Sequence, residues 1–298
     1  MLETVVICAL QGSEREGEAE LERASTLYTL PITATSGTIT ITIPRPQTHP
    51  TVYLLTFVSP PDNRLLTSFI ETFTLALALL RTNHPHGVLI TTSGNPKFYS
   101  NGLNLEHVAS QDLWWSKIFW PFMKNLLTYP MPTVALINGH AFAGGFITSM
   151  CHDYRVMNPS KGFLCMNELE FGAPLIPPLT SIFRNKLSAK TYRSIVLEAH
   201  RFTGPQALKE DIVDALGALE ETFKLIDEKK LDKKAKSGIY SVIRRETWRE
   251  TFGFVKGDDK ECYDGDKWVR DTVKEAEREE EEAKQLAQRW EKTQGAKL

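Results

Sequence analysis

The sequence lacks several features that assign a chain to a broad class. It has no run of about 20 apolar residues, so no membrane span is expected. The apolar stretch at residues 5–10 has no basic flank and precedes an acidic segment, which argues against a secretory signal peptide. The net charge of −2 gives no electrostatic reason to expect nucleic acid as a partner.

Cysteine is scarce, and its spacing excludes further classes. The four cysteines, at positions 8, 151, 165 and 262, include no CxxC pair, so neither a zinc site nor a redox pair is expected. The chain also lacks the H-E-x-x-H motif of zinc proteases and the G-x-S-x-G motif of serine hydrolases. We therefore predict no metal site, and free thiols in a reducing compartment.

The sequence does contain an alternation of β-rich and helix-like segments. Helices are expected at 65–81, 110–127 and 143–152, and strands at 38–43, 52–58, 87–93, 133–138, 153–158 and 163–168. Such alternation is typical of βαβ units and predicts an α/β fold with a mainly parallel sheet. Two charged segments flank this region. Residues 13–24 are expected to form a solvated helix or disorder, and 273–292 a long solvated helix with i,i+4 Glu–Lys pairs.

Two loops place glycine directly after a buried strand, at residues 98–105 (FYSNGLNL) and 138–145 (NGHAFAGG). Glycine lets backbone amides approach a ligand, and the start of a following helix favours negative charge. Each loop by itself is better explained as ordinary turn chemistry. If both supplied one N–H group to the same oxygen atom, they would form an oxyanion hole.

As a pair, the two loops resemble the F-x-A-G-x-D-L and N-G-x-A-x-G-G-G motifs of the crotonase (enoyl-CoA hydratase/isomerase) superfamily, and residues 201–214 (RFTGPQALKEDIVD) resemble a later family helix. The resemblance implies a crotonase-like ββα spiral core at 38–215. A variable N-terminal extension (1–37) would precede it, and a helical C-terminal region (216–298) would follow. It further implies a homotrimer or dimer of trimers and an acyl-CoA thioester substrate. No cofactor is expected, because coenzyme A is part of the substrate.

The same resemblance assigns roles to individual residues. The amides of Leu103 and Gly144 would form the oxyanion hole for the thioester oxygen. Other substrate-binding candidates are Asn101, Gly102, Lys97 and Ile147. Lys97, like Arg64, is a candidate for contacting the phosphates of coenzyme A, with an ordinary surface cation as the alternative.

Glu168 is the candidate proton carrier. Family hydratases have two glutamates, but the first of these positions is Ile147 here. The second position is Glu168, in an M-x-E-L stretch similar to plant-type peroxisomal Δ3,Δ2-enoyl-CoA isomerases. One carboxylate suits a double-bond shift, because the same base can take a proton from C2 and return it to C4, whereas hydration suits two groups.

Alternatives remain open at this stage. Glu170 shares the face of Glu168 if the stretch is extended, and it is the second carboxylate that a hydratase or a thioester hydrolase would need. A non-catalytic acyl-CoA-binding subunit is the alternative from another class. Asn104 replaces the usual Asp of the first loop, and residues 174–180 replace a common glycine-rich turn, which leaves acyl-chain specificity open.

The last three residues, Ala296, Lys297 and Leu298, resemble the C-terminal peroxisomal address whose type form is SKL. A receptor that reads this address needs an exposed, free carboxy terminus. We therefore expect a peroxisomal location and an import receptor as a partner, with a chance match as the alternative.

Overall fold

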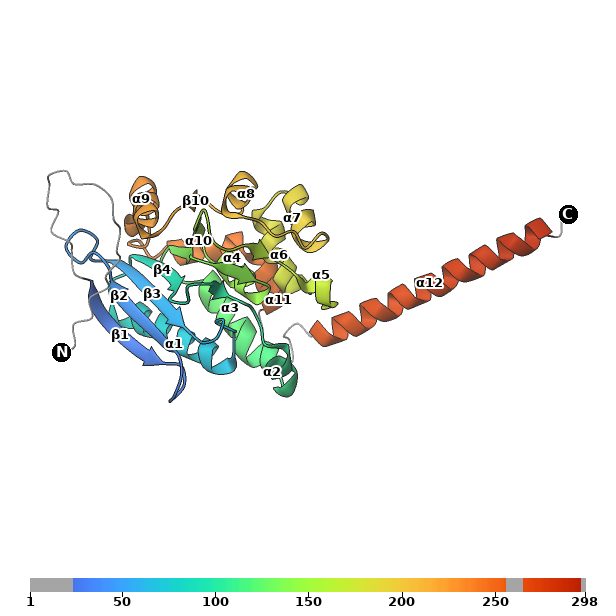
Figure 1. Cartoon of the computed structure of the whole chain (residues 1–298), viewed down its shortest axis with the longest axis horizontal. Coiled ribbons are helices and arrows are strands. Elements are labelled where there is room, and N and C mark those ends of the chain that lie inside the picture. Colours follow the sequence, from blue (N-terminus) through green and yellow to red (C-terminus); the bar gives the residue numbers. More distant parts are fainter. Residues whose placement is uncertain (1–23, 256–264, 296–298) are drawn as a thin grey trace.

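The computed structural model describes residues 24–255 and 265–295. Strands and helices alternate along the chain, and the main sheet has the strand order β1-β2-β3-β4-β6-β8-β10 (Figure 1). Its strands are β1 (Ser25–Pro31), β2 (Thr38–Ile43), β3 (Val52–Val58), β4 (Val88–Ser93), β6 (Thr133–Ile137), β8 (Tyr154–Met157) and β10 (Ala215–Leu216). The first three are antiparallel, and from β3 onward all neighbours are parallel. The predicted α/β class with a parallel-rich sheet is confirmed.

A second, smaller sheet positions the candidate site. It consists of β5 (Phe98–Ser100), β7 (His140–Phe142) and β9 (Leu164–Cys165), all parallel, in that order. β5 leads into the first glycine loop, β7 into the second, and β9 into Glu168. Because the carboxyl ends of parallel strands lie at one edge, the three segments emerge on the same side of this sheet.

The helices cover both faces of the main sheet. In α1 (Thr67–Asn83), the buried residues recur every three or four positions, as expected for a helix with one core-facing side: Phe69, Ile70, Phe73, Ala76, Leu77 and Leu80. The helices that follow are α2 (Leu105–Ser110), α3 (Trp120–Leu127), α4 (Gly144–Met150), α5 (Glu168–Phe171), α6 (Pro177–Lys186), α7 (Ala189–Val196), α8 (Gly204–Lys209), α9 (Leu219–Lys229), α10 (Tyr240–Thr247), α11 (Arg249–Val255) and α12 (Gly265–Gly295).

The apolar core divides into two clusters across the sheet. Leu89 of β4 belongs to the larger cluster, with the α1 side chains, whereas its neighbours Val88 and Ile90 pack in the smaller cluster with Phe223 of α9. Successive side chains of a strand point to opposite faces, so the continuous apolar run of β4 fills both clusters. This is why a strand covered on both sides has no polar face.

Two predicted elements differ from the structure. The helix expected at 110–127 begins later, with a π-helical segment (Trp115–Phe119) that continues into α3, and a turn separates it from α2. Leu113 lies between them at a φ of 57°, outside the helical region, and this breaks the helical path. The strand expected at 163–168 is also wrong at its end, because only Leu164–Cys165 is extended and Glu168 begins α5.

The ends of the chain add elements outside the expected core. β1 pairs with β2, so the sheet starts upstream of residue 38. At the other end, Trp248 and Val255 belong to the larger core cluster. The proposed division at residues 37/38 and 215/216 stays a prediction.

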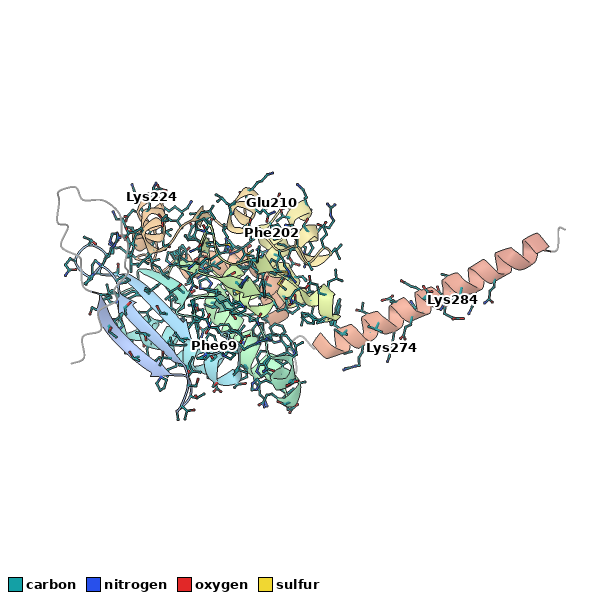
Figure 2. All side chains as sticks on the ribbon, in the orientation of Figure 1. Phe69, Phe202, Glu210, Lys224, Lys274 and Lys284 are labelled. Carbon is teal, nitrogen blue, oxygen red and sulfur yellow. The ribbon has the colours of Figure 1, made fainter. Side chains whose placement is uncertain are left out.

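α12 is a long charged helix that extends away from the rest of the molecule (Figure 1). Lys274 and Lys284 stand clear of the other elements (Figure 2), whereas Val269, near the start of the helix, packs against the larger core cluster. It carries i,i+4 ion pairs, with Lys284 Nζ 3.6 Å from Glu280 Oε1, which confirms the predicted charged helix. The predicted address at 296–298 and most of the acidic segment 13–24 lie outside the described residues. Among the helices that the structure describes, none is long and apolar enough to cross a membrane.

Candidate active site

The first glycine loop is held in a fixed orientation by the turn at residues 59–65. The Leu65 N–H group donates to the Gly102 carbonyl at 2.9 Å. Since the peptide bond is trans and planar, the Leu103 N–H group on the same peptide points in the opposite direction. Gly102 has a φ of 80°, which suits glycine and disfavours other residues.

Arg64 fixes the other side of Leu103. Its Nη1 donates to the Leu103 carbonyl at 2.9 Å, and its Nε donates to Asp62 Oδ2 at 3.1 Å. Asn101 Nδ2 donates to the same Asp62 oxygen at 2.6 Å. The sequence suggested Arg64 as a phosphate ligand or a surface cation, whereas its guanidinium braces the loop.

Asn63, which the sequence did not single out, connects the same turn to β5. It is fully buried, and its Nδ2 donates to the carbonyls of Phe98 and Tyr99 and to the Ser93 hydroxyl. The backbone carbonyl of Asn63 accepts a hydrogen bond from the Ser100 hydroxyl at 2.7 Å. The only sequence signal for this role was an asparagine in a turn that precedes a helix.

The second loop places Gly144 at the first position of α4. The Ala143 carbonyl accepts from the Ile147 N–H at 3.0 Å, so the Gly144 N–H on that peptide points out of the helix start. Ala143 itself has a φ of 49° and a ψ of −123°, a strained conformation for a residue with a side chain. The family motif has glycine at this position.

The two loops contact each other closely. A Cβ atom added to Gly102 would lie 2.9 Å from the Gly144 nitrogen, and one added to Gly144 would lie 3.1 Å from Cγ of Leu103. Within the described residues, neither the Leu103 N–H nor the Gly144 N–H has a hydrogen-bond acceptor. Two free, oriented amides are therefore held side by side, where they can bind an anionic oxygen.

Glu168 is attached to the second loop through β9. The Ala143 N–H donates to the Cys165 carbonyl at 2.9 Å, and Glu168 follows on the first turn of α5. The residue is only 8% exposed, and its Oε2 is buried without a hydrogen-bond partner in the part of the chain that the structure describes. Burial disfavours the charged carboxylate and raises the pKa of Glu168 to about 7.

Glu170, the competing carboxylate, lies in a different environment. It is exposed, and its Oε2 accepts from Arg201 Nη2 at 3.0 Å. In an extended stretch it would share the face of Glu168. That condition is not met, since both residues lie in α5, where positions two apart point in different directions.

The remaining candidates are dispersed. Ile147 is buried in the larger core cluster. Lys97 is exposed, with its Nζ 5.3 Å from the centre of the Phe98 ring. Among the described residues, no group of three His, Cys, Asp or Glu side chains could hold a metal ion.

Comparison with known proteins agrees with this geometry. Residues 47–232 match the profile of the family described as enoyl-CoA hydratase/isomerase, which is more than half of the chain. The chain belongs to the enoyl-CoA hydratase/isomerase family. The recognition made from the two glycine loops is therefore confirmed.

Curated relatives and solved structures add detail. Enoyl-CoA delta isomerase 3 of Arabidopsis thaliana is 30% identical over 213 residues, which cover 67% of this chain and 89% of the relative. Peroxisomal enoyl-CoA delta isomerase 2 of the same plant is 28% identical, with 68% and 91% covered. The apo structure of a Mycobacterium tuberculosis enoyl-CoA isomerase superposes with a TM-score of 0.60 at 19% identity, covering 69% of this chain and 90% of that one. This likeness confirms the crotonase-like fold.

Proposed function

We propose that this family member is a Δ3,Δ2-enoyl-CoA isomerase that uses Glu168 as its only proton carrier. The observation that carries the proposal is a buried carboxyl group with one oxygen free, on a strand–helix segment attached to the loop of Gly144. A pKa near 7 suits a group that must both accept and return a proton at neutral pH.

In the proposed reaction, the Glu168 carboxylate removes a proton from C2 of a 3-enoyl-CoA. The electron pair of the C–H bond becomes delocalised onto the thioester oxygen, forming an enolate. The amides of Leu103 and Gly144 stabilise this charge, and one such donor contributes roughly 3 kcal/mol in measured cases. The glutamic acid then protonates C4, and the double bond ends between C2 and C3.

The position of Ile147 supports isomerisation over hydration. A hydratase needs a second group to activate water, and the family position that could supply it is a buried isoleucine in α4. Glu170 is a poor substitute, because Arg201 holds it at the surface. The names of the plant relatives are consistent with this choice.

The experiment that tests the proposal supplies the purified protein separately with a 3-enoyl-CoA and a 2-enoyl-CoA. We expect conversion of the first to the 2-enoyl product and negligible formation of a 3-hydroxyacyl-CoA from the second. Hydration at a comparable rate would identify a hydratase. Release of free coenzyme A would identify a thioester hydrolase, and binding without turnover would identify a non-catalytic subunit.

We also propose a peroxisomal location, import through the address at Ala296, Lys297 and Leu298, and a homotrimer or dimer of trimers. Two of the plant relatives are named peroxisomal, although a mouse relative, 29% identical over 164 residues, is mitochondrial. Removing residues 296–298 should move the protein to the cytosol without changing its activity in vitro. A truncated protein that still reached peroxisomes would show either that the tripeptide is a chance match or that a partner carries the protein in. Mass measurement in solution would test the oligomer.

A further inference from the structure

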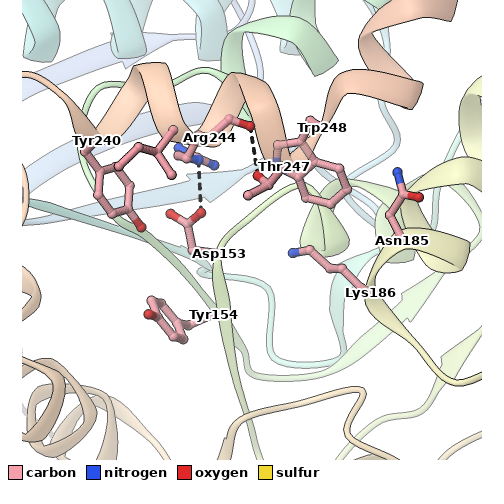
Figure 3. Close-up of a pocket in the computed structure, with 9 residues that line it drawn as sticks. Asp153, Tyr154, Asn185, Lys186, Tyr240, Arg244, Thr247 and Trp248 are labelled. Carbon is pink, nitrogen blue, oxygen red and sulfur yellow. Dashed lines mark hydrogen bonds and ion pairs between the residues drawn. The ribbon is translucent and has the colours of Figure 1, made fainter.

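A cleft of about 410 Å³ opens between the C-terminal end of α6, the start of β8 and helix α10 with the following Trp248 (Figure 3). Its walls are mostly aromatic or aliphatic, from Tyr154, Tyr240, Ile243 and Trp248. Lys186, the last residue of α6, and Arg244 of α10 bring positive charge into it. None of these side chains has a role in the proposed isomerase reaction.

The two guanidinium groups near the cleft each have several partners on the protein. Arg244 Nε lies 2.9 Å from Asp153 Oδ1, and its other nitrogens donate to backbone carbonyls, including Leu126 at 2.9 Å. Arg155 Nη2 lies 3.2 Å from Asp214 Oδ2, and its Nε donates to a backbone carbonyl. Each guanidinium is therefore paired with one carboxylate.

Lys186 is the third cation of this region, and it lacks a carboxylate. Its Nζ donates to the His152 carbonyl, which also accepts from Arg155 Nη1 at 2.9 Å. The Trp248 ring lies 4.9 Å from the same Nζ. Within the described chain no other polar partner is found for it, so the protein supplies an acceptor for only one of the three N–H bonds of a Lys186 ammonium.

We propose that this cleft binds a small carboxylate that carries an apolar group, with its charge on Lys186. The carboxylate would complete the hydrogen bonding of the ammonium and balance the third cation. The apolar group would contact the ring of Trp248 and the side chain of Ile243. Asp153 does not oppose this, because Arg244 neutralises it and the Thr133 N–H also donates to it.

Binding at this place has a distinctive signature. Burial and the adjacent Arg155 lower the pKa of Lys186 well below its usual value, against the weaker opposing effects of Asp153 and Cys151. Arg244 lowers it further, and the nearby Tyr240 hydroxyl is itself held neutral by burial. A carboxylate that pairs with the ammonium favours the charged form, so binding takes up protons at any pH where part of the Lys186 population is neutral beforehand.

Hexanoate is a suitable probe, with hexanamide as its uncharged match. The heat of binding would be titrated near pH 8 in two buffers of different ionisation enthalpy, since the difference reports proton uptake. We expect hexanoate to bind with proton uptake and to bind at least tenfold more tightly than hexanamide, as a hydrogen bond to a charged group implies. Inorganic phosphate, which lacks an apolar part, should bind more weakly than hexanoate.

Two variants locate the site. Lys186→Met should weaken hexanoate binding at least tenfold and abolish the proton uptake, whereas Lys190→Met, at an exposed position on α7, should change neither. The titration is repeated in Glu168→Gln, because hexanoate in the candidate active site would also drive proton uptake there. Proton uptake that persists in this variant belongs to the cleft.

The proposal would be overturned by no binding of hexanoate at tens of millimolar, by equal binding of hexanamide, or by loss of the proton uptake in Glu168→Gln. Undiminished binding by Lys186→Met would overturn it as well. Should Lys186→Met fail to fold, the hexanamide comparison and the uptake in Glu168→Gln decide the question by themselves.

Discussion

Glu168 and Arg244 are both buried ionisable side chains, but they have opposite surroundings. Arg244 is paired with Asp153 and its terminal nitrogens donate to backbone carbonyls, so among the described residues only its Nε, which lies in the ion pair, lacks a hydrogen bond. Glu168 has an oxygen that no described group satisfies, and its pKa is raised as a result of burial. A buried charge that is paired with an opposite charge holds elements together, whereas an unpaired buried acid is poised to exchange a proton.

The largest effect is expected for Glu168→Gln. The amide keeps the shape of the side chain but cannot accept the C2 proton, so isomerase activity should fall about 10²- to 10⁴-fold. Activity measured with a 3-enoyl-CoA checks this, with Glu170→Gln as the matched control because Glu170 is exposed and paired with Arg201. Full activity in Glu168→Gln together with loss in Glu170→Gln would transfer the role to Glu170.

Arg244→Met should show the opposite pattern, with large effects on stability. It leaves Asp153 without its guanidinium partner and frees the carbonyls of Tyr129 and Leu126. Breaking a buried ion pair in this way costs about 3–5 kcal/mol. Denaturant unfolding would measure the loss, and Arg245→Met, the exposed neighbour on α10, should cost little. An unfolding free energy equal to wild type would show that Arg244 is not a structural anchor.

The raised pKa of Glu168 also predicts how stability varies with pH. The folded protein holds this proton up to about pH 7, while the unfolded chain releases it near 4.5. Between these values the folded state binds more protons, so stability falls as pH rises, by up to about 3 kcal/mol. Glu168→Gln has no carboxyl group at this position, so its stability should lack this pH dependence. The unfolding free energy of the variant minus that of the wild type should therefore increase from pH 4.5 to pH 8. A constant difference across that range would contradict the raised pKa.

A smaller effect on activity is expected from Arg64, which supports the first glycine loop without contacting substrate. Arg64→Met removes the donor to the Leu103 carbonyl and loosens the loop that carries the Leu103 amide. We expect kcat to fall about tenfold with little change in KM, because the amide acts mainly in the transition state. Arg81→Met, at an exposed position on α1, is the matched control. A rise in KM without a change in kcat would instead support a substrate-binding role for Arg64.

Sequence reasoning reached the parts of the site that local pattern determines. The run TITITI and the apolar run at 87–93 predicted strands close to their observed positions, and the two glycine loops indicated the family. It did not find the roles of Asn63 and Arg64, because these depend on contacts with a loop more than 30 residues away. The Lys186 cleft was missed for the same reason, since β8, α6 and α10 meet only in the folded chain.

Ala143 offers the smallest test, because it carries strain rather than a charge. The positive φ of Ala143 costs about 1–3 kcal/mol because the residue has a Cβ atom. Glycine would remove this strain, but its greater flexibility in the unfolded chain costs up to about 1 kcal/mol of stability. Ala143→Gly should therefore stabilise the fold by about 1 kcal/mol, or about 2–4 °C in Tm. Ala78→Gly, on the exposed side of α1, should have the opposite sign, because glycine inside a helix costs about 1 kcal/mol. If Ala143→Gly lost stability as Ala78→Gly does, the conformation of Ala143 would not be strained. If Ala143→Gly gained stability while activity fell, the strain itself would contribute to positioning that amide.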